Sequence, residues 1–167
     1  MHLGEFGVWT TYRRIGEENA GQAARLAENL GYGAFWLGGS PQLPALTPLL
    51  ETTERIVVAT GILNVWQSDT EQVAGDFARL EEEFPGRVLL GIGIGHPEAT
   101  SRYSTPLSAM AEFLDALDAA AVPVPRGRRC LAALGPRMLA LSAERSLGAH
   151  SYFVTAAHTK AAARWNC

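Results

Sequence analysis

Three alternate glycines interrupt an apolar run in the stretch RVLLGIGIGHPE, which covers residues 87–98. Gly91, Gly93 and Gly95 each give up side-chain packing, and inside a strand each costs roughly 0.5–1 kcal/mol relative to alanine. A planar ligand lying against the backbone would explain that cost, because parallel sheets and barrels bind their ligands at the carboxyl ends of the strands. The run therefore predicts a binding site for a flat ring.

The same glycines do not form a dinucleotide-binding fingerprint. That motif has the spacing G-x-G-x-x-G at the turn from a first strand into a helix. Here the spacing is G-x-G-x-G, with His96 in place of the third glycine, and three other predicted strands come first. The sequence also lacks Walker A, H-E-x-x-H and G-x-S-x-G motifs. These differences disfavour a Rossmann-type nucleotide site.

A second candidate site follows the apolar run CLAALG, where Gly135 and Pro136 open a helical pattern. Proline is common as the first residue of a helix. The backbone N–H groups of Arg137 and Met138 would have no partner inside that helix, and with the helix dipole they favour an anion. This stretch predicts a contact to a negatively charged group.

Six short runs that are apolar at nearly every position alternate with helical patterns. Such strands are typical of parallel sheets buried on both faces. The predicted strands are Phe6–Trp9, Ala34–Gly38, Ile56–Ile62, Arg87–Gly95, Cys130–Gly135 and His150–Val154.

Apolar spacing, capping residues and helix breakers mark the helices between these strands. Ser68 and Glu71 form an S-x-x-E capping box, Gly31 ends the first helix, and Thr155 caps the last. The predicted helices cover residues 16–30, 43–53, 69–84 and 107–117, and two more begin at Pro136 and after Thr155.

Strict alternation of strands and helices predicts one domain over residues 1–167 with a right-handed parallel sheet. This α/β pattern fits either a TIM-type barrel or an open doubly wound sheet. A closed eight-stranded barrel usually takes about 250 residues, whereas this chain has 167. Either two units are missing or the sheet is open.

Composition narrows the possible partners and location. The chain is 47% hydrophobic and 19% charged with a net charge of −3, which argues against nucleic acid or an anionic membrane as the main partner. The N-terminus lacks a signal-peptide pattern and no apolar run has the length of a membrane helix, so we expect a cytoplasmic protein.

Cys130 and Cys167 match no metal or redox spacing. His150 and His158 lack a third ligand, so no metal site is expected.

Three stretches, in this order, resemble the luciferase-like flavin and deazaflavin oxidoreductases: RIVVATGILNVW (55–66), PGRVLLGIGIGHPEA (85–99) and LAALGPRMLALSAER (131–145). The sequence is most similar to the short coenzyme F420-dependent members. The resemblance implies a TIM-type (β/α)8 barrel of which this chain holds about six βα units. The last two strands would be missing, as in a C-terminally truncated member. It also implies an enzyme that transfers a hydride between reduced F420 and a small organic substrate.

The resemblance also assigns roles around the ring. It places a non-proline cis peptide bond between Gly61 and Ile62 against the back of the ring, and Asn64 beside a polar ring edge or phosphate tail. Gly93 and Gly95 would leave room for the ring.

The remaining assignments concern the substrate side and the tail of the cofactor. His96 and Glu98 are competing candidates for the catalytic proton donor. The ribityl or phosphate portion would lie at the helix start formed by Leu134, Gly135, Pro136, Arg137 and Met138.

This sequence departs from the family pattern at the end of the second strand. Many relatives have an acidic residue or histidine there, whereas this chain reads LGGS (37–40), so backbone contact from Gly38 or Gly39 would substitute. With two strands missing, the first and sixth strands would have unpaired edges that a homodimer could cover.

The aromatic residues at the strand ends are expected to pack in the core or the barrel mouth. These are Trp9, Phe35, Trp36 and Tyr152. Trp66 is the aromatic residue expected to face the pocket. Three functions stay open: an F420-dependent oxidoreductase, an FMN-dependent luciferase-like monooxygenase, and an inactive truncated remnant of the same barrel.

Overall fold

The computed structural model describes residues 1–95 and 105–165. The strands are β1 (Gly7–Thr11), β2 (Ala34–Gly38), β3 (Val57–Thr60), β4 (Leu63–Asn64), β5 (Val88–Gly93), β6 (Arg129–Ala132) and β7 (Ala149–His150). They form one parallel sheet in the order β1-β2-β3-β5-β6-β7, and the short β4 pairs with β5. Strands that follow one another in the chain lie side by side, as in a TIM-type barrel and unlike a doubly wound sheet.

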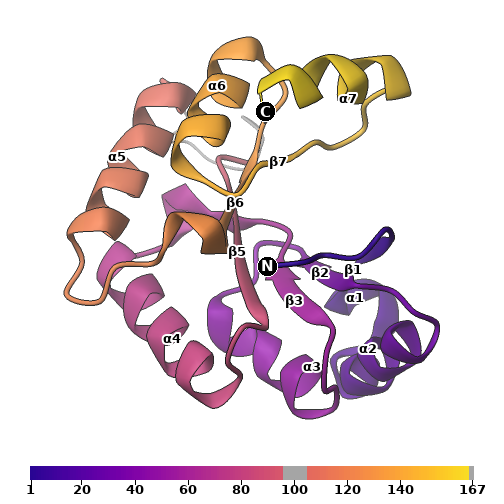
Figure 1. The fold of residues 1–167 in the computed structure, drawn as a ribbon. Helices are drawn as coiled ribbons and strands as arrows, with labels where there is room; N and C mark the ends of the chain where they lie inside the picture. The colour runs from indigo at the N-terminus through magenta and orange to yellow at the C-terminus, as the bar shows by residue number, and fades with distance from the viewer. Residues whose placement is uncertain (96–104, 166–167) are drawn as a thin grey trace.

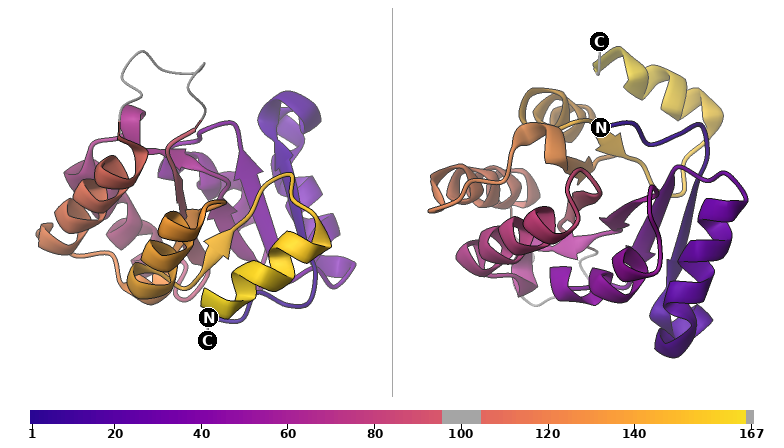
Figure 2. Two further views of the ribbon diagram at one scale, coloured as in Figure 1. Left: turned by 90° about the horizontal axis from the view of Figure 1, so that it is seen from above. Right: turned by 60° about the horizontal axis from the view of Figure 1, so that its bottom comes forward.

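The helices cover the outside of the curled sheet. They are α1 (Tyr12–Ile15), α2 (Ala20–Asn29), α3 (Thr47–Glu51), α4 (Thr70–Glu83), α5 (Pro106–Ala119), α6 (Pro136–Arg145) and α7 (Ala156–Ala162). Figures 1 and 2 show α2 to α6 in an arc around the strands, so that the sheet has a convex face toward the helices and a concave face on the inside. In the part of the chain that the structure describes, β1 and β7 are the two edges, and the fold is a curled half-barrel. None of the described helices has the length and apolarity needed to cross a membrane.

Five of the six predicted strands are present, and β4 is a short addition. The sixth prediction, His150–Val154, is largely wrong, because β7 covers only Ala149–His150. One predicted helix cap is also wrong by a residue. Asp69, not Ser68, caps α4: its side chain accepts a hydrogen bond from the backbone N–H of Gln72 (2.9 Å). The Ser68 hydroxyl donates to the carbonyl oxygen of Asn64 (2.8 Å) instead. Thr155 caps α7 as predicted, accepting from the N–H of His158 (3.2 Å).

The main core lies between the convex face and the helices. Leu90 and Ile92 of β5 are fully buried there, in one cluster with Leu80 of α4 and Leu114 and Leu117 of α5. Burial of apolar surface of this kind supplies most of the stability of a domain.

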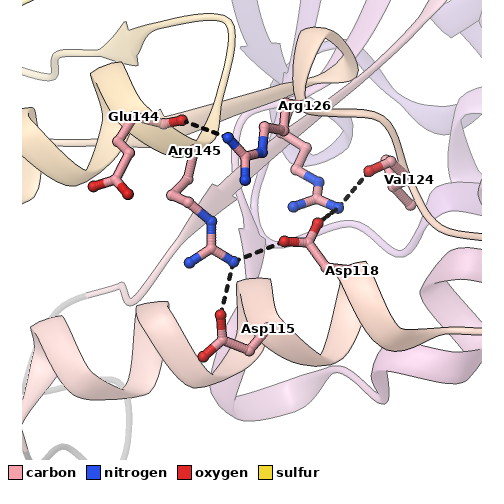
Figure 3. A network of polar contacts seen from close by, with 7 residues as sticks. Asp115, Asp118, Val124, Arg126, Glu144 and Arg145 are labelled. Atoms are coloured by element: carbon pink, nitrogen blue, oxygen red, sulfur yellow. Dashed lines mark hydrogen bonds and ion pairs between the residues drawn. The ribbon is translucent and has the colours of Figure 1, made fainter.

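A chain of ion pairs joins β6 to α5 and α6 on the same side of the sheet (Figure 3). Arg129 of β6 is fully buried, and it donates to Asp118 Oδ1 (2.6 Å) and to the carbonyl oxygen of Val124. Arg145 of α6 donates to Asp118 Oδ2 (2.8 Å) and to Asp115 Oδ1 (2.7 Å). Asp118 therefore bridges two arginines and holds the β6–α6 unit onto α5.

Candidate functional site

The concave face is lined by small side chains and filled by two indoles. Alternation along the strands directs one set of residues inward, and Ala34, Val57, Ala59, Leu89 and Cys130 form a cluster against Trp36. The indole of Trp9 of β1 packs beside Gly38 and Gly61, at the carboxyl ends of β2 and β3. The interior is thus filled at one end and open at the other.

A cavity of about 510 Å³ lies at this open end. Ligand sites of small-molecule enzymes are typically of this size, and parallel barrels place them at the carboxyl ends of the strands. Each of the seven strands contributes to the lining, either directly or through the residues that follow it. The lining residues are Trp9, Gly39, Ser40, Gly61, Ile62, Asn64, Ile94, Gly95, Ala132, Ala133, Leu134, Gly135, Met138, His150 and Tyr152.

Seven of the eleven predicted cofactor-binding residues meet in this cavity. They are Gly61, Ile62, Asn64, Gly95, Leu134, Gly135 and Met138. The other four, Gly38, Gly93, Pro136 and Arg137, do not line it. The two candidate catalytic residues, His96 and Glu98, lie outside the described residues.

Gly91 and Gly93 are glycines for a different reason from the predicted one, which was to leave room for a flat ring. A Cβ at Gly91 would overlap the carbonyl oxygen of Thr60, and the Thr60 hydroxyl donates to the Gly91 carbonyl oxygen (2.7 Å). A Cβ at Gly93 would lie 2.6 Å from Cγ1 of Ile62. These two glycines make room for the end of the neighbouring strand, whereas Gly95 is the one of the three that lines the cavity.

Gly38 likewise makes room for a side chain of the protein. A Cβ there would overlap the indole of Trp9, whose Nε1–H donates to the carbonyl oxygen of Gly61 (2.8 Å). Trp9 is 43% exposed and lines the cavity, so the expectation that it only packs is incomplete. The hydrogen bond fixes the indole beside Gly61, in the wall of the site.

The turn after β3 has the predicted backbone. The Gly61–Ile62 peptide bond is cis. Asn64 is buried, and its Oδ1 accepts from the backbone N–H of Trp66 (3.0 Å), which caps the 3-10 turn Val65–Gln67. Asn64 lines the cavity, and its amide nitrogen donates to no residue within 1–95 or 105–165.

Trp66 does not face the pocket, contrary to the prediction. Its indole N–H donates to the carbonyl oxygen of Ile94 (2.9 Å), and its ring packs against the main core. Tyr152 is an aromatic residue that does line the pocket, and the centroid of its ring lies 6.2 Å from that of Trp9.

His150 of β7 is one of the lining residues that the sequence did not indicate, together with Ser40, Ile94, Ala132 and Ala133. It was weighed only as a metal ligand, but its ring stacks on Trp36 of β2 with centroids 4.6 Å apart and planes 20° from parallel. Burial lowers the pKa of His150, which favours the neutral imidazole. The sequence signal is its place as the first residue of the last predicted strand, but the curl that brings β7 opposite β2 is not a local property.

The cavity carries no formal charge among its described lining residues, which include no Asp, Glu, Lys or Arg. Deeper in the interior, burial raises the pKa of the Cys130 thiol to about 12, so this side chain stays protonated. No cluster of three metal-ligating side chains occurs within residues 1–95 and 105–165. The site therefore suits an uncharged, largely apolar group with a few hydrogen-bonding atoms.

A family model described as luciferase-like monooxygenase matches residues 1–165. Solved structures share the fold. The coenzyme F420-dependent tetrahydromethanopterin reductase from Methanopyrus kandleri matches with a TM-score of 0.77 and 16% identity, over 99% of this chain and 60% of that one. A search of curated proteins gave no match.

Two further structures represent different cofactors. An F420-dependent secondary alcohol dehydrogenase in complex with an F420–acetone adduct has a TM-score of 0.74 and 15% identity, covering 99% of this chain and 65% of that one. The oxygenating constituent of 3,6-diketocamphane monooxygenase from Pseudomonas putida, in complex with FMN, has a TM-score of 0.74 and 12% identity, covering 99% and 62%. The chain thus spans less than two thirds of the length of these solved relatives.

Proposed function

Because the chain belongs to the luciferase-like monooxygenase family, we propose that its pocket binds the ring of coenzyme F420 and that the protein transfers a hydride between this deazaflavin and a small organic substrate. The observation that carries the proposal is the cavity at the carboxyl ends of the strands, in which seven of the predicted cofactor-binding residues meet. When bound, the deazaflavin supplies the hydride donor or acceptor, and the protein supplies position and electrostatics.

The residues present fit a planar tricyclic ring. The cavity is largely apolar, and its volume of about 510 Å³ lies in the usual range for cofactor sites. Ile62 and Met138 give it apolar surface. Asn64 lines the cavity, and its amide nitrogen, which donates to none of the described residues, would serve a polar edge of the ring.

The start of α6 supports the position of the cofactor's tail. Gly135 lines the cavity, and a Cβ there would meet no atom within 4 Å, so the backbone is open to an approaching group. The N–H groups of Arg137 and Met138 belong to the first turn of a ten-residue helix and have no partner within it. A phosphate near these donors would be favoured by hydrogen bonding and by the helix dipole.

FMN is the second candidate, because one structure with this fold was solved in complex with FMN. The apolar lining and the donors at the start of α6 suit a flavin ring and its phosphate as well as they suit a deazaflavin. His96 and Glu98 remain candidate proton donors on sequence grounds alone.

A thermal-shift comparison tests the proposal. A ligand present at about 100 times its Kd adds roughly 2.7 kcal/mol, which raises the Tm of a domain of this size by roughly 5–10 °C. We expect that shift with F420, and a smaller one with FMN. A larger shift with FMN would favour the flavin function, whereas no shift with either at tens of micromolar would refute cofactor binding by this chain.

Two variants test whether the ligand that raises the Tm binds in the pocket. Leu134 lines the cavity and is 50% exposed, so Leu134→Trp fills the site at little cost to folding and should abolish the shift. Leu26 is 60% exposed on α2, away from the cavity, and Leu26→Trp is the matched control that should keep it. A broad, non-cooperative melt of the wild-type protein that neither ligand sharpens would instead support the inactive remnant.

A further inference from the structure

The side chain of His150 is presented to the cavity in a fixed orientation. One face of its imidazole is covered by Trp36, with ring centroids 4.6 Å apart and planes inclined by 20°. Trp36 is itself held in the cluster on the concave face. The stack occupies a face of the imidazole and not the edge that carries the ring nitrogens, and His150 lines the cavity.

Both ring nitrogens of His150 are available to a ligand. Neither forms a hydrogen bond to any residue that the structure describes, whereas His158, the histidine of α7, bonds the carbonyl oxygen of Leu134 (2.9 Å). A neutral imidazole has one N–H donor and one acceptor nitrogen. Polar atoms beside an apolar cavity are costly to leave unpaired once a ligand excludes water.

The surroundings of His150 favour the neutral imidazole. Tyr152 lies two residues further along its own segment, and Cys130 of β6 remains a protonated thiol. The strands on the opposite side contribute Trp9 and Trp36. From α6, Arg145 is engaged with Asp115 and Asp118 on the convex side. No carboxylate or cation of the described lining residues faces the ring, and burial lowers its pKa.

We infer that His150 is a substrate-binding residue that accepts a hydrogen bond from the hydroxyl group of an uncharged organic substrate in this cavity. The inference rests on the proposed function in that it assigns the substrate class for the same pocket. A charged substrate would have to shed its water against apolar walls with no opposite charge to compensate. A neutral hydroxyl compound satisfies the acceptor nitrogen of His150 without that cost.

Proton NMR of the wild-type protein tests the inference without any redox cofactor. Cyclohexanol serves as the uncharged hydroxyl probe, and cyclohexanecarboxylate is its charged counterpart. We expect cyclohexanol to move the C2–H signal of His150 and leave that of His2 unchanged. The carboxylate should move neither.

The pH dependence of binding gives the second readout. Protonation removes the acceptor nitrogen, so the affinity for cyclohexanol should fall about tenfold as the pH drops through the pKa of His150. His150→Phe keeps an aromatic ring on Trp36 but has no nitrogen, and it should bind more weakly with no pH dependence. His2→Phe is the matched control and should behave as the wild type.

Three results would overturn the inference: no response of the His150 signal to cyclohexanol, preferred binding of the carboxylate, or an unchanged pH dependence in His150→Phe. The wild-type titration needs no variant to fold. It is also independent of F420, so a failure here with a positive F420 thermal shift removes the assignment of His150 alone. A positive result without an F420 shift removes the proposed cofactor alone.

Discussion

On the convex side of β5, Leu90 and Ile92 are buried among leucines of α4 and α5, while on the concave side of the same strand Gly91 and Gly93 have no side chains at all. The convex face is stabilised by apolar side chains that fill the space between the sheet and the helices. The concave face requires residues without side chains at these two positions, because atoms of Thr60 and Ile62 occupy the space that a Cβ would take. Alternate residues of this one strand therefore have different roles: one set packs in the core, and the other set shapes the inner face on which the cavity lies.

Charge is divided between the faces in the same way. Asp118 holds two arginines on the convex side, and one of them, Arg129, is fully buried. The cavity on the concave side has no Asp, Glu, Lys or Arg among its described lining residues, and burial lowers the pKa of its histidine, His150. Ionic contacts stabilise the outer layer, and the inner surface is left suitable for an uncharged ligand.

Removing a filled position on the convex side should have the largest effect on stability. Leu90 is fully buried in the main core, and Leu90→Ala removes transfer energy and leaves a cavity, at a cost of about 2–5 kcal/mol. Urea unfolding followed by circular dichroism measures the loss. A cost below about 1 kcal/mol would show that the convex core does not carry the stability of the fold.

Filling an empty position on the concave side should have the next largest effect. Gly91→Ala places a methyl group on the carbonyl oxygen of Thr60, which is backbone and cannot rotate away. We expect a loss of about 1–3 kcal/mol, typical of overpacking, in the same urea assay. Gly127 is exposed and a Cβ there meets nothing within 4 Å, so Gly127→Ala is the control and should change stability by less than about 0.5 kcal/mol. Equal effects of the two substitutions would remove the packing explanation for Gly91.

The ion-pair chain should give a smaller, pH-dependent effect. Burial alone would raise the pKa of Asp118, but its hydrogen bonds to Arg129 and Arg145 and their positive charges outweigh burial and lower it. Because the folded state favours the ionised carboxylate, this stability is complete above the ordinary pKa of 3.8 and is lost as the pH falls through the lowered value.

Asp118→Asn isolates that contribution. Asp118 is 38% exposed, and screening by water limits the expected loss at pH 7 to about 1 kcal/mol. The loss should not vanish, because Arg129 is fully buried and the substitution removes the charge of its carboxylate partner. Urea unfolding at pH 7 and at pH 2.5 is the measurement. A difference between wild type and variant that is the same at both pH values would contradict the assignment to the Asp118 charge.

The sequence predicted the convex side well because its signals are local. Apolar runs marked the strands, and Thr155 and the Gly135–Pro136 pair marked two helix starts at the observed residues. The cap of α4 was misplaced because Ser68 and Asp69 are both good caps and only the backbone decides between them. The turn after β3 was predicted through family resemblance rather than from the residues themselves.

The concave side was predicted in part because its contacts join distant segments. Trp9 and Tyr152 meet at the mouth from opposite edges of the sheet, and His150 meets Trp36 across the interior. Nothing near Trp66 in the sequence indicates that its indole turns to the carbonyl oxygen of Ile94. The alternation that assigns Gly91 and Gly93 to the inside is local, but the atoms that fill the space beside them belong to another strand.

The smallest expected effect sharpens the contrast between required and dispensable glycines. Gly75 lies within α4 on its exposed surface, and a Cβ there would meet nothing within 4 Å. No close approach requires glycine at this position, so Gly75→Ala should stabilise the protein by about 0.5–1 kcal/mol through the higher helix propensity of alanine and the smaller entropy of its unfolded chain. The Tm should rise by roughly 1–4 °C in the same thermal assay, with ligand response unchanged. If Gly75→Ala were destabilising, the outer surface of α4 would have to contact another molecule. The protein would then have an outer interface in addition to the convex core and the concave site.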